Sequence, residues 1–427
     1  MSESAAGRLR LVDHHCHGVV RRDLDRTAFE ALLTEATPAA RGGTVFESAV
    51  FDHAASDNTA SDNTVFTSTV FTSTVFDSQI GFAVRRWCAP VLDLEPHAAP
   101  DAYLERRASL GHAEVTRRFL AAAGLAALCV DTGFEPEPLL APAELGRIAD
   151  ASHHEIVRLE QVAEQCAAEV LKGGALMGYA DAVRERLAEK ARTAVGFKSI
   201  AAYRHGLDLS GERPSDAEVF TAAVRWLTVL DKGDTVRLAD ETLHRFLVWC
   251  AVDLGLPIQF HAGYGDADLD LGRCDPLLLT GLLRAIEPTG VPVLLLHNYP
   301  FHRHAGYLAQ VFSNVFLDVG LATHNLGHGS HRLVAEALEL APFGKVLYSS
   351  DAFALPELYY LGAELFRRAL AAFLETGVEQ DAWTTDDAVR VARMIGADNA
   401  RRAYRLDPPP HVLPFPGEDA RRARSDP

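Results

Sequence analysis

The chain has 427 residues and a formal net charge of −17, from 41 basic and 58 acidic side chains. An acidic excess of this size argues against nucleic acid or an anionic membrane as a partner, because both are negatively charged. Hydrophobic residues make up 48% of the chain and charged residues 23%, which is typical of a globular protein with a large core. No apolar run approaches the roughly 20 residues that span a bilayer.

The cysteines and the first residues of the chain indicate a cellular compartment. The six cysteines are scattered and form no Cys-x-x-Cys motif, so they are expected to be reduced thiols. The first residues show no signal-peptide pattern. We therefore expect a cytoplasmic protein that acts on a small-molecule substrate, and whether it forms a homo-oligomer is left open.

The first half of the chain combines strands, helices and one repetitive segment. Strands are expected at 8–12, 124–131 and 193–200, and helices at 26–36, 102–123, 142–172, 180–194, 215–230 and 235–254. Residues 43–78 contain near-copies of one pentapeptide, such as Thr64-Val65-Phe66-Thr67-Ser68. A period of five suits neither a strand nor a helix, so this segment is expected to be a low-complexity insertion.

The second half alternates regularly between strands and helices. Strands are expected at 257–261, 291–297, 314–319 and 345–351, and helices at 276–286, 304–312, 329–340 and 356–376. Alternation of this kind predicts βαβ units and a parallel sheet. About eight strands favour a (β/α)8 TIM-type barrel with helical additions over an open sheet. The barrel domain is expected to span 1–406, and the proline-rich residues 407–427 a C-terminal tail.

Several polar residues stand where an apolar strand is expected to end. They are His15, His17, Lys198, His261, His297 and Asp351. Alternate residues of a strand face the same side, so the first two imidazoles can reach one point. Each residue alone is best interpreted as a polar strand cap. Together, on the one rim where barrel active sites form, they indicate a metal centre with nitrogen and oxygen ligands.

The order of these residues resembles that of the metal-dependent amidohydrolase superfamily. Residues 13–17, Asp-His-His-Cys-His, match its Asp-x-His-x-His opening signature, and residues 395–404 resemble its closing helix. The stretches 197–204 and 349–352 are most similar to the amidohydrolase domains found beside glutamine-synthetase domains. The insertion at 43–78 departs from the family pattern.

This resemblance implies a role for each residue. His15, His17 and His261 would be metal ligands, and Asp351 would bind the metal and carry a proton. His297 would be either a ligand of a second metal or an electrophile that polarises the scissile carbonyl. Lys198 would be either a carboxylated lysine bridging two ions or a substrate-binding residue.

Two neighbouring residues and the remaining histidines complete the set of polar candidates. Arg204 could clamp a substrate carboxylate, with Tyr203 beside it in the substrate site, although an outward-facing surface arginine is an equal alternative. Six other histidines are expected in loops or behind the ligands: His14, His302, His304, His324, His328 and His331. His153 and His154 are expected on a helix, and no role is predicted for them.

The predicted function is a metal-dependent hydrolase that cleaves an amide or related C–N bond of a small polar substrate with metal-activated water. Zinc is the metal expected first, with manganese or iron as alternatives, and one or two ions are compatible with the ligand set. The alternatives are a metal-dependent decarboxylase or hydratase on the same barrel, and a ligand-binding homologue without turnover.

Overall fold

The computed structural model describes residues 9–36, 75–173, 176–230 and 236–406. Most of the predicted insertion and the whole predicted tail lie outside these ranges. The last four residues of the predicted insertion are described, and they form part of the packed structure. Val75–Asp77 is a 3-10 helix, and Phe76, which is 3% exposed, stacks on the ring of Phe29.

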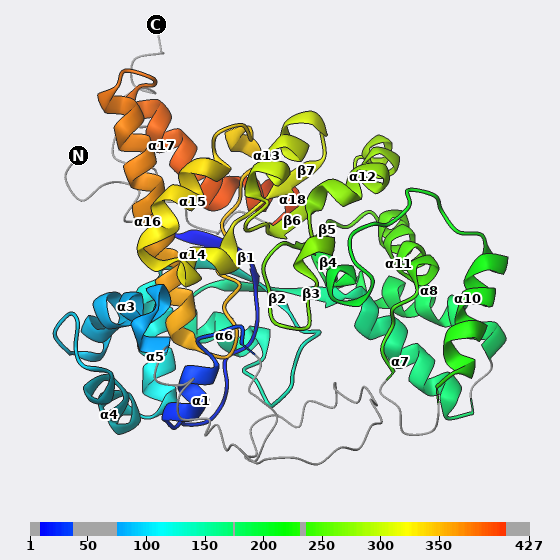
Figure 1. The fold of residues 1–427 in the computed structure, drawn as a ribbon, viewed down its shortest axis with the longest axis horizontal. Helices are drawn as coiled ribbons and strands as arrows, with labels where there is room; N and C mark the ends of the chain where they lie inside the picture. Colours follow the sequence, from blue (N-terminus) through cyan, green and yellow to red (C-terminus); the bar gives the residue numbers. More distant parts are fainter. Residues whose placement is uncertain (1–8, 37–74, 174–175, 231–235, 407–427) are drawn as a thin grey trace, which may run out of the picture.

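Seven parallel strands form one curled sheet in the order in which they occur along the chain (Figure 1). Their bounds are β1 Leu11–Cys16, β2 Leu125–Asp131, β3 Ser152–Arg158, β4 Gly196–Ser199, β5 Ile258–Ala262, β6 Val293–His297 and β7 Val315–Leu317. β6 has the sequence VLLLH and is buried throughout, as expected for a parallel strand covered on both faces. Because every pair of neighbouring strands is parallel, all carboxyl ends lie at the same rim.

The barrel closes through a segment that is not a regular strand. The predicted strand at 345–351 is wrong, because Val346 makes only an isolated bridge to β7. The segment nevertheless contacts both neighbours: Leu347 N donates to Leu317 O, and Asp351 N donates to His15 O. Asp351 has φ 49°, which is incompatible with an extended strand. The architecture is therefore a TIM-type barrel with seven strands and an irregular eighth position, and the predicted fold class is confirmed.

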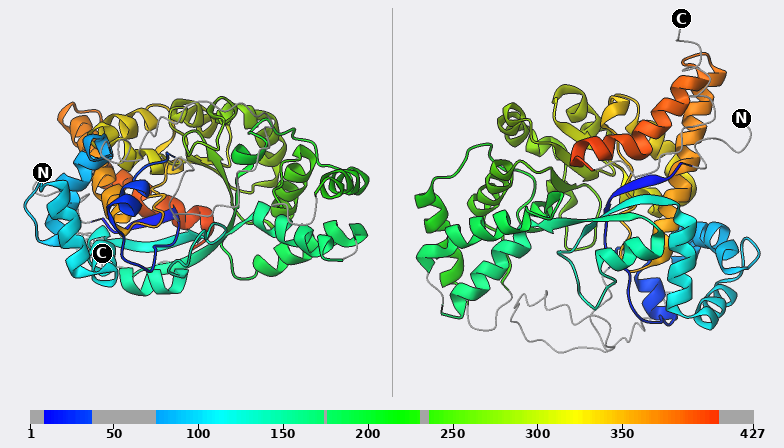
Figure 2. Two further views of the ribbon diagram at one scale, coloured as in Figure 1. Left: turned by 60° about the horizontal axis from the view of Figure 1, so that its bottom comes forward. Right: turned by 180° about the vertical axis from the view of Figure 1, so that it is seen from behind.

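Helices surround the strands (Figures 1 and 2). Their bounds are α1 Arg26–Ala31, α3 Gln79–Ala83, α4 Pro100–Leu110, α5 His112–Ala123, α6 Pro142–Ala149, α7 Leu159–Leu171, α8 Tyr179–Lys190, α9 Ala201–Arg204, α10 Asp216–Thr228, α11 Glu241–Leu254, α12 Thr280–Ile286, α13 His302–Val311, α14 Gly320–Asn325, α15 Ser330–Ala337, α16 Pro356–Glu379, α17 Thr385–Arg393 and α18 Asn399–Tyr404. The group α7, α8, α10 and α11 lies at one end of the molecule, and α3, α4 and α5 at the other. None of the helices in the described ranges has the length and apolarity required to cross a membrane.

The sequence pattern missed one strand, β3. The predicted single helix at 142–172 is wrong, because α6, β3 and α7 occupy this range. Asp150 ends α6 in the left-handed conformation, with φ 50°. His153 and His154 therefore lie on β3 and not on a helix. The predicted helix at 102–123 is likewise two helices, because Gly111, with φ 75°, separates α4 from α5.

A buried ion pair joins α4 to α16. Arg107 Nε donates to Glu357 Oε1 at 2.7 Å, and the Tyr103 hydroxyl donates to the same oxygen at 3.2 Å. Arg107 is 4% exposed and Glu357 is fully buried. Neither charge can be rehydrated in place, so each depends on the other.

Arg107→Met should therefore destabilise the protein by about 3–5 kcal/mol, because it leaves a buried carboxylate without its cation. The urea midpoint of unfolding measures this loss. Arg117→Met is the matched control, since Arg117 makes its ion pair with Glu114 on the surface of α5 and should shift the midpoint little. Equal midpoints for the two variants would contradict the importance given to the buried pair.

Candidate metal centre

The structure brings the six predicted strand-end residues to the carboxyl rim of the barrel. His15 lies on β1, Lys198 on β4, His261 on β5 and His297 on β6. The other two, at positions 17 and 351, lie just beyond β1 and in the closing segment. All six are buried except Asp351, which is partly buried. The parallel sheet explains this convergence, since side chains far apart in sequence come from equivalent ends of neighbouring strands.

Asp351 is the centre of the cluster. Its Oδ1 lies 3.1 Å from His15 Nε2 and 3.5 Å from His17 Nε2, and its Oδ2 lies 3.3 Å from His297 Nδ1. One ligand atom from each of His15, His17 and Asp351 fits within a span of 4.8 Å. Two imidazoles and a carboxylate this close can hold a divalent cation.

Lys198 and His261 lie beside this group of three. Lys198 Nζ is 3.3 Å from His15 Nε2, and the ring centroids of His261 and His297 are 4.6 Å apart. His261 Nε2 is buried and has no hydrogen-bond partner in the described part of the chain. A buried imidazole nitrogen without a partner is costly, and a metal ion or a substrate would supply the missing contact. The donor set therefore fits a divalent cation.

Burial keeps the imidazoles in the form that binds metal. It lowers the pKa of His15 to about 3 and the pKa of His297 to about 4, and it lowers the pKa of His261 well below its usual value. Burial alone would raise the pKa of Asp351, but His297 and the hydrogen bonds from His15 and His17 outweigh it and hold this pKa well below its usual range. At neutral pH the imidazoles of His15, His261 and His297 are thus neutral and Asp351 is ionised, which is the protonation state needed for ligation.

Lys198 differs from an ordinary lysine. It is 2% exposed, and burial lowers the pKa of its ammonium to about 8, although Asp131 and Asp351 oppose this shift. A lysine with a pKa near 8 has a substantial neutral fraction at physiological pH. The neutral amine is the form that can be carboxylated, so both roles predicted for Lys198 remain open.

The backbone at the ligands is held in unusual conformations. His297 has φ 67° and Asp351 φ 49°, both in the left-handed region that side-chain-bearing residues seldom adopt. Asp318 Oδ1 accepts from His297 N at 3.0 Å. Asp13 accepts from both the backbone N and the hydroxyl of Ser350, the residue before Asp351. Asp13 and Asp318 therefore position the ligands through these hydrogen bonds.

Three charged residues around the centre were not predicted from the sequence. Asp131 at the end of β2 pairs with Arg158 at 2.6 Å, and Arg158 is the register partner of Lys198 on the neighbouring strand. Asp318 follows β7, and its second oxygen lies 3.0 Å from His14 Nε2. The same strand-end rule that found Lys198 would have found Asp131 and Asp318.

The two predicted substrate residues lie near the centre in different surroundings. The ring centroids of Tyr203 and His261 are 4.6 Å apart. Arg204 Nη2 lies 3.5 Å from Glu164 Oε1, and its side chain is 14% exposed. A role in substrate binding stays a prediction for both residues.

Two of the remaining histidines lie behind the ligands. His14 is buried, and its Nδ1 lies 3.0 Å from the hydroxyl of Tyr404. His324 is buried on α14, close enough to Asp351 and His297 for their charges to act on its pKa, which burial lowers to about 4.

The other four histidines contact different groups. His302 and His304 contact Glu336 and Asp275, respectively. The rings of the last two, at positions 328 and 331, lie against one another near the start of α15.

A comparison with known protein families shows to which family this barrel belongs. The family model described as amidohydrolase matches residues 12–406. The chain therefore belongs to the amidohydrolase family, and the predicted resemblance is confirmed. Membership supports an enzyme of the metal-dependent hydrolase type.

Particular relatives agree with this assignment. Protein fluG of Emericella nidulans is 30% identical over 292 residues, which is 62% of this chain and 33% of fluG. The crystal structure of a proposed metal-dependent hydrolase from Lactobacillus casei matches this chain with a TM-score of 0.74 and 27% sequence identity. The match covers 93% of this chain and 96% of that one. The structure of a uronate isomerase from Thermotoga maritima matches this chain with a TM-score of 0.59 and 13% sequence identity. The match covers 94% of this chain and 97% of the isomerase chain. This last likeness concerns the fold alone.

Proposed function

We propose that the protein is a hydrolase that uses a divalent metal to cleave an amide or related C–N bond of a small polar substrate. The observation that carries this proposal is the group formed by His15, His17 and Asp351, whose ligand atoms lie within 4.8 Å of one another at the carboxyl rim. In barrels of this type the rim is where substrates are bound and converted.

His15, His17, His261 and Asp351 would hold the first ion, and His297 would either hold a second ion or polarise the scissile carbonyl. Zinc is the metal that we propose, with manganese or iron as alternatives. A divalent cation bound here would lower the pKa of water to about 7 and withdraw charge from a carbonyl oxygen.

Asp351 would act as the proton carrier. Its pKa is held well below the usual range, so it is ionised and can accept a proton from the attacking water. It would then pass that proton to the departing nitrogen, so that an amine leaves and a carboxylic acid remains. His297 is a neutral imidazole next to Asp351, and its ring N–H can orient the substrate carbonyl by a hydrogen bond.

Lys198 has two roles compatible with its position. As a carbamate it would carry a negative charge and add oxygen ligands beside His15. As an unmodified lysine it would donate hydrogen bonds to the substrate. Arg204 and Tyr203 remain proposed substrate residues. A cytoplasmic location is also proposed, supported by six cysteines that are all free and buried.

The experiment that tests this function is product analysis with a panel of small amides in water labelled with ¹⁸O. Hydrolysis predicts equal amounts of an amine and a carboxylic acid, with the label in the acid. Release of carbon dioxide without an amine would instead identify a decarboxylase, and addition of water without bond cleavage a hydratase. A panel that binds to the protein but yields no product would favour a homologue without turnover.

A further inference from the structure

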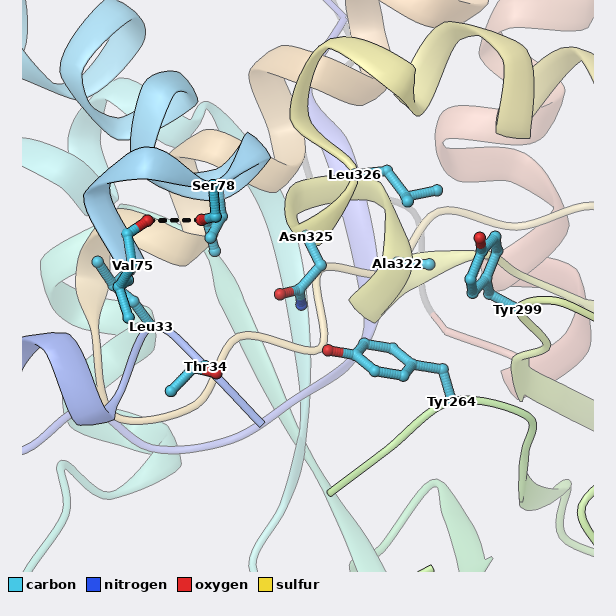
Figure 3. A pocket seen from close by; sticks show the side chains of 10 residues that line it. Leu33, Thr34, Val75, Ser78, Tyr264, Tyr299, Ala322, Asn325 and Leu326 are labelled. Carbon is cyan, nitrogen blue, oxygen red and sulfur yellow. Dashed lines mark hydrogen bonds between the residues drawn. The ribbon is translucent and has the colours of Figure 1, made fainter. Parts of the chain in front are cut away.

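A cavity of about 370 Å³ lies at the same rim of the barrel (Figure 3). Two of its lining residues follow predicted ligands in the sequence: Tyr264 stands three residues after His261, and Tyr299 two residues after His297. Tyr264 N donates to Tyr299 O, and the two rings are arranged edge to face with their centroids 6.4 Å apart. One wall of the cavity is therefore built on the strand ends that carry His261 and His297, and the cavity has the size of a small-molecule site.

The wall of the cavity is apolar, with a few uncharged hydrogen-bonding groups. Leu33 and Leu326 are among the apolar residues, and Thr34, Tyr264 and Asn325 supply hydroxyl and amide groups. Figure 3 shows the Tyr264 hydroxyl directed toward the side chains of Thr34 and Asn325. The Asn325 amide nitrogen donates to a backbone carbonyl of α14 at 3.1 Å, which leaves its carbonyl oxygen for another partner. The residues that line the cavity in the described ranges include no charged side chain.

Three basic side chains around the rim lie beside carboxylates. The guanidinium groups of Arg158, Arg204 and Arg237 lie 2.6, 3.5 and 2.5 Å from carboxylate oxygens of Asp131, Glu164 and Asp268, respectively. A guanidinium with a carboxylate neighbour gains less from a second carboxylate, because its charge is partly neutralised. These three arginines therefore offer little attraction to an anionic group inside the cavity.

Two acidic residues are sequence neighbours of the cavity wall. Glu35 follows the wall residue Thr34, and Asp266 lies two residues beyond Tyr264. Acidic side chains here add no attraction for a substrate carboxylate.

We propose that this cavity is a specificity site that binds an uncharged aromatic or branched aliphatic group bearing one hydrogen-bonding atom, and that it excludes carboxylates. The substrate class is then an amide with an uncharged ring or chain next to the scissile bond. This inference rests on the proposed hydrolase function for its connection to catalysis. The binding preference itself is a property of the cavity and is measured separately.

Acetanilide and 4-acetamidobenzoate form a matched pair of probes, because they differ only by a carboxylate on the ring. Calorimetry with the full-length protein should show that acetanilide binds at least about tenfold more tightly. Asn325→Lys places a cation in the wall and should reverse that order. Gln380→Lys is the control, since Gln380 is an exposed residue at the end of α16 and should leave the preference unchanged.

A second variant tests the opposite wall of the cavity. Thr34→Phe should fill the space and reduce acetanilide binding at least about tenfold. Equal binding of the two probes to the unaltered protein, or no binding of either, would overturn the cavity assignment. Selective binding of acetanilide without release of aniline would support the cavity and contradict the hydrolase function, so the two failures are distinguishable.

Discussion

Asp351→Asn is expected to reduce kcat by at least about 10²–10⁴-fold, the loss typical of removing a general acid–base group. The reason is the position of the carboxylate between His15, His17 and His297. Asparagine keeps an oxygen near the imidazoles but cannot accept the proton of the attacking water. Some metal should therefore remain bound while turnover is lost, and steady-state kinetics with metal analysis of the same sample measures both.

The control for this change is Asp253→Asn. Asp253 lies on the exposed side of α11 and pairs with Arg213, so the same substitution there should leave kcat unchanged. An Asp351→Asn enzyme with the turnover of the unaltered protein would refute the role of Asp351 as proton carrier.

Lys198→Ala is expected to lower the metal content per chain if Lys198 acts as a carbamate. Loss of its ligand oxygens should weaken metal binding by at least about tenfold, and a short-chain carboxylic acid should partly restore it by occupying the vacated space. Because the pKa of Lys198 is lowered to about 8, the neutral amine becomes dominant above that pH. Bicarbonate should therefore promote metal uptake more strongly above pH 8 than below it.

The alternative role of Lys198 gives a different result. If the unmodified ammonium binds substrate, Lys198→Ala should leave the metal content unchanged and raise KM. Lys190→Ala is the control, because Lys190 is a partly exposed lysine on α8 and should change neither quantity. Unchanged metal content and unchanged KM in Lys198→Ala would exclude both roles.

The alternation of strands and helices in the sequence is sufficient to predict the barrel and the residues at its rim. The rule that active-site residues follow strand ends places His15, Lys198, His261 and Asp351 in one group from the sequence alone. The rule works because parallel strands place equivalent ends together, so a one-dimensional pattern fixes a three-dimensional neighbourhood.

The missed features have physical causes. The first residues of β3 are polar and partly exposed, so they carry no apolar signal, and good helix formers on both sides concealed the strand. The left-handed conformation at Asp150, which separates α6 from β3, is set by the backbone and leaves little trace in composition. The segment 345–351 has the apolar pattern of a strand, but only Val346 bridges to β7, and Asp351 at its end is in the left-handed conformation, with φ 49°.

The contacts by which Asp13 and Asp318 position the ligands were beyond sequence reasoning. Asp13 binds Ser350 across more than 300 positions of the chain, and Asp318 holds the backbone of His297. Such contacts depend on which strand ends are neighbours at the level of single atoms. A pattern of strands and helices does not specify them.

The most direct test of the central claim is the metal content of the full-length protein, measured together with its amidase activity on the same sample with and without chelation. We expect at least one divalent ion per chain, loss of activity when the ion is removed, and recovery on addition of zinc or manganese. His17→Ala should bind less metal and fail to recover. Full activity in a preparation shown to be free of metal would contradict the assignment of a metal-dependent hydrolase.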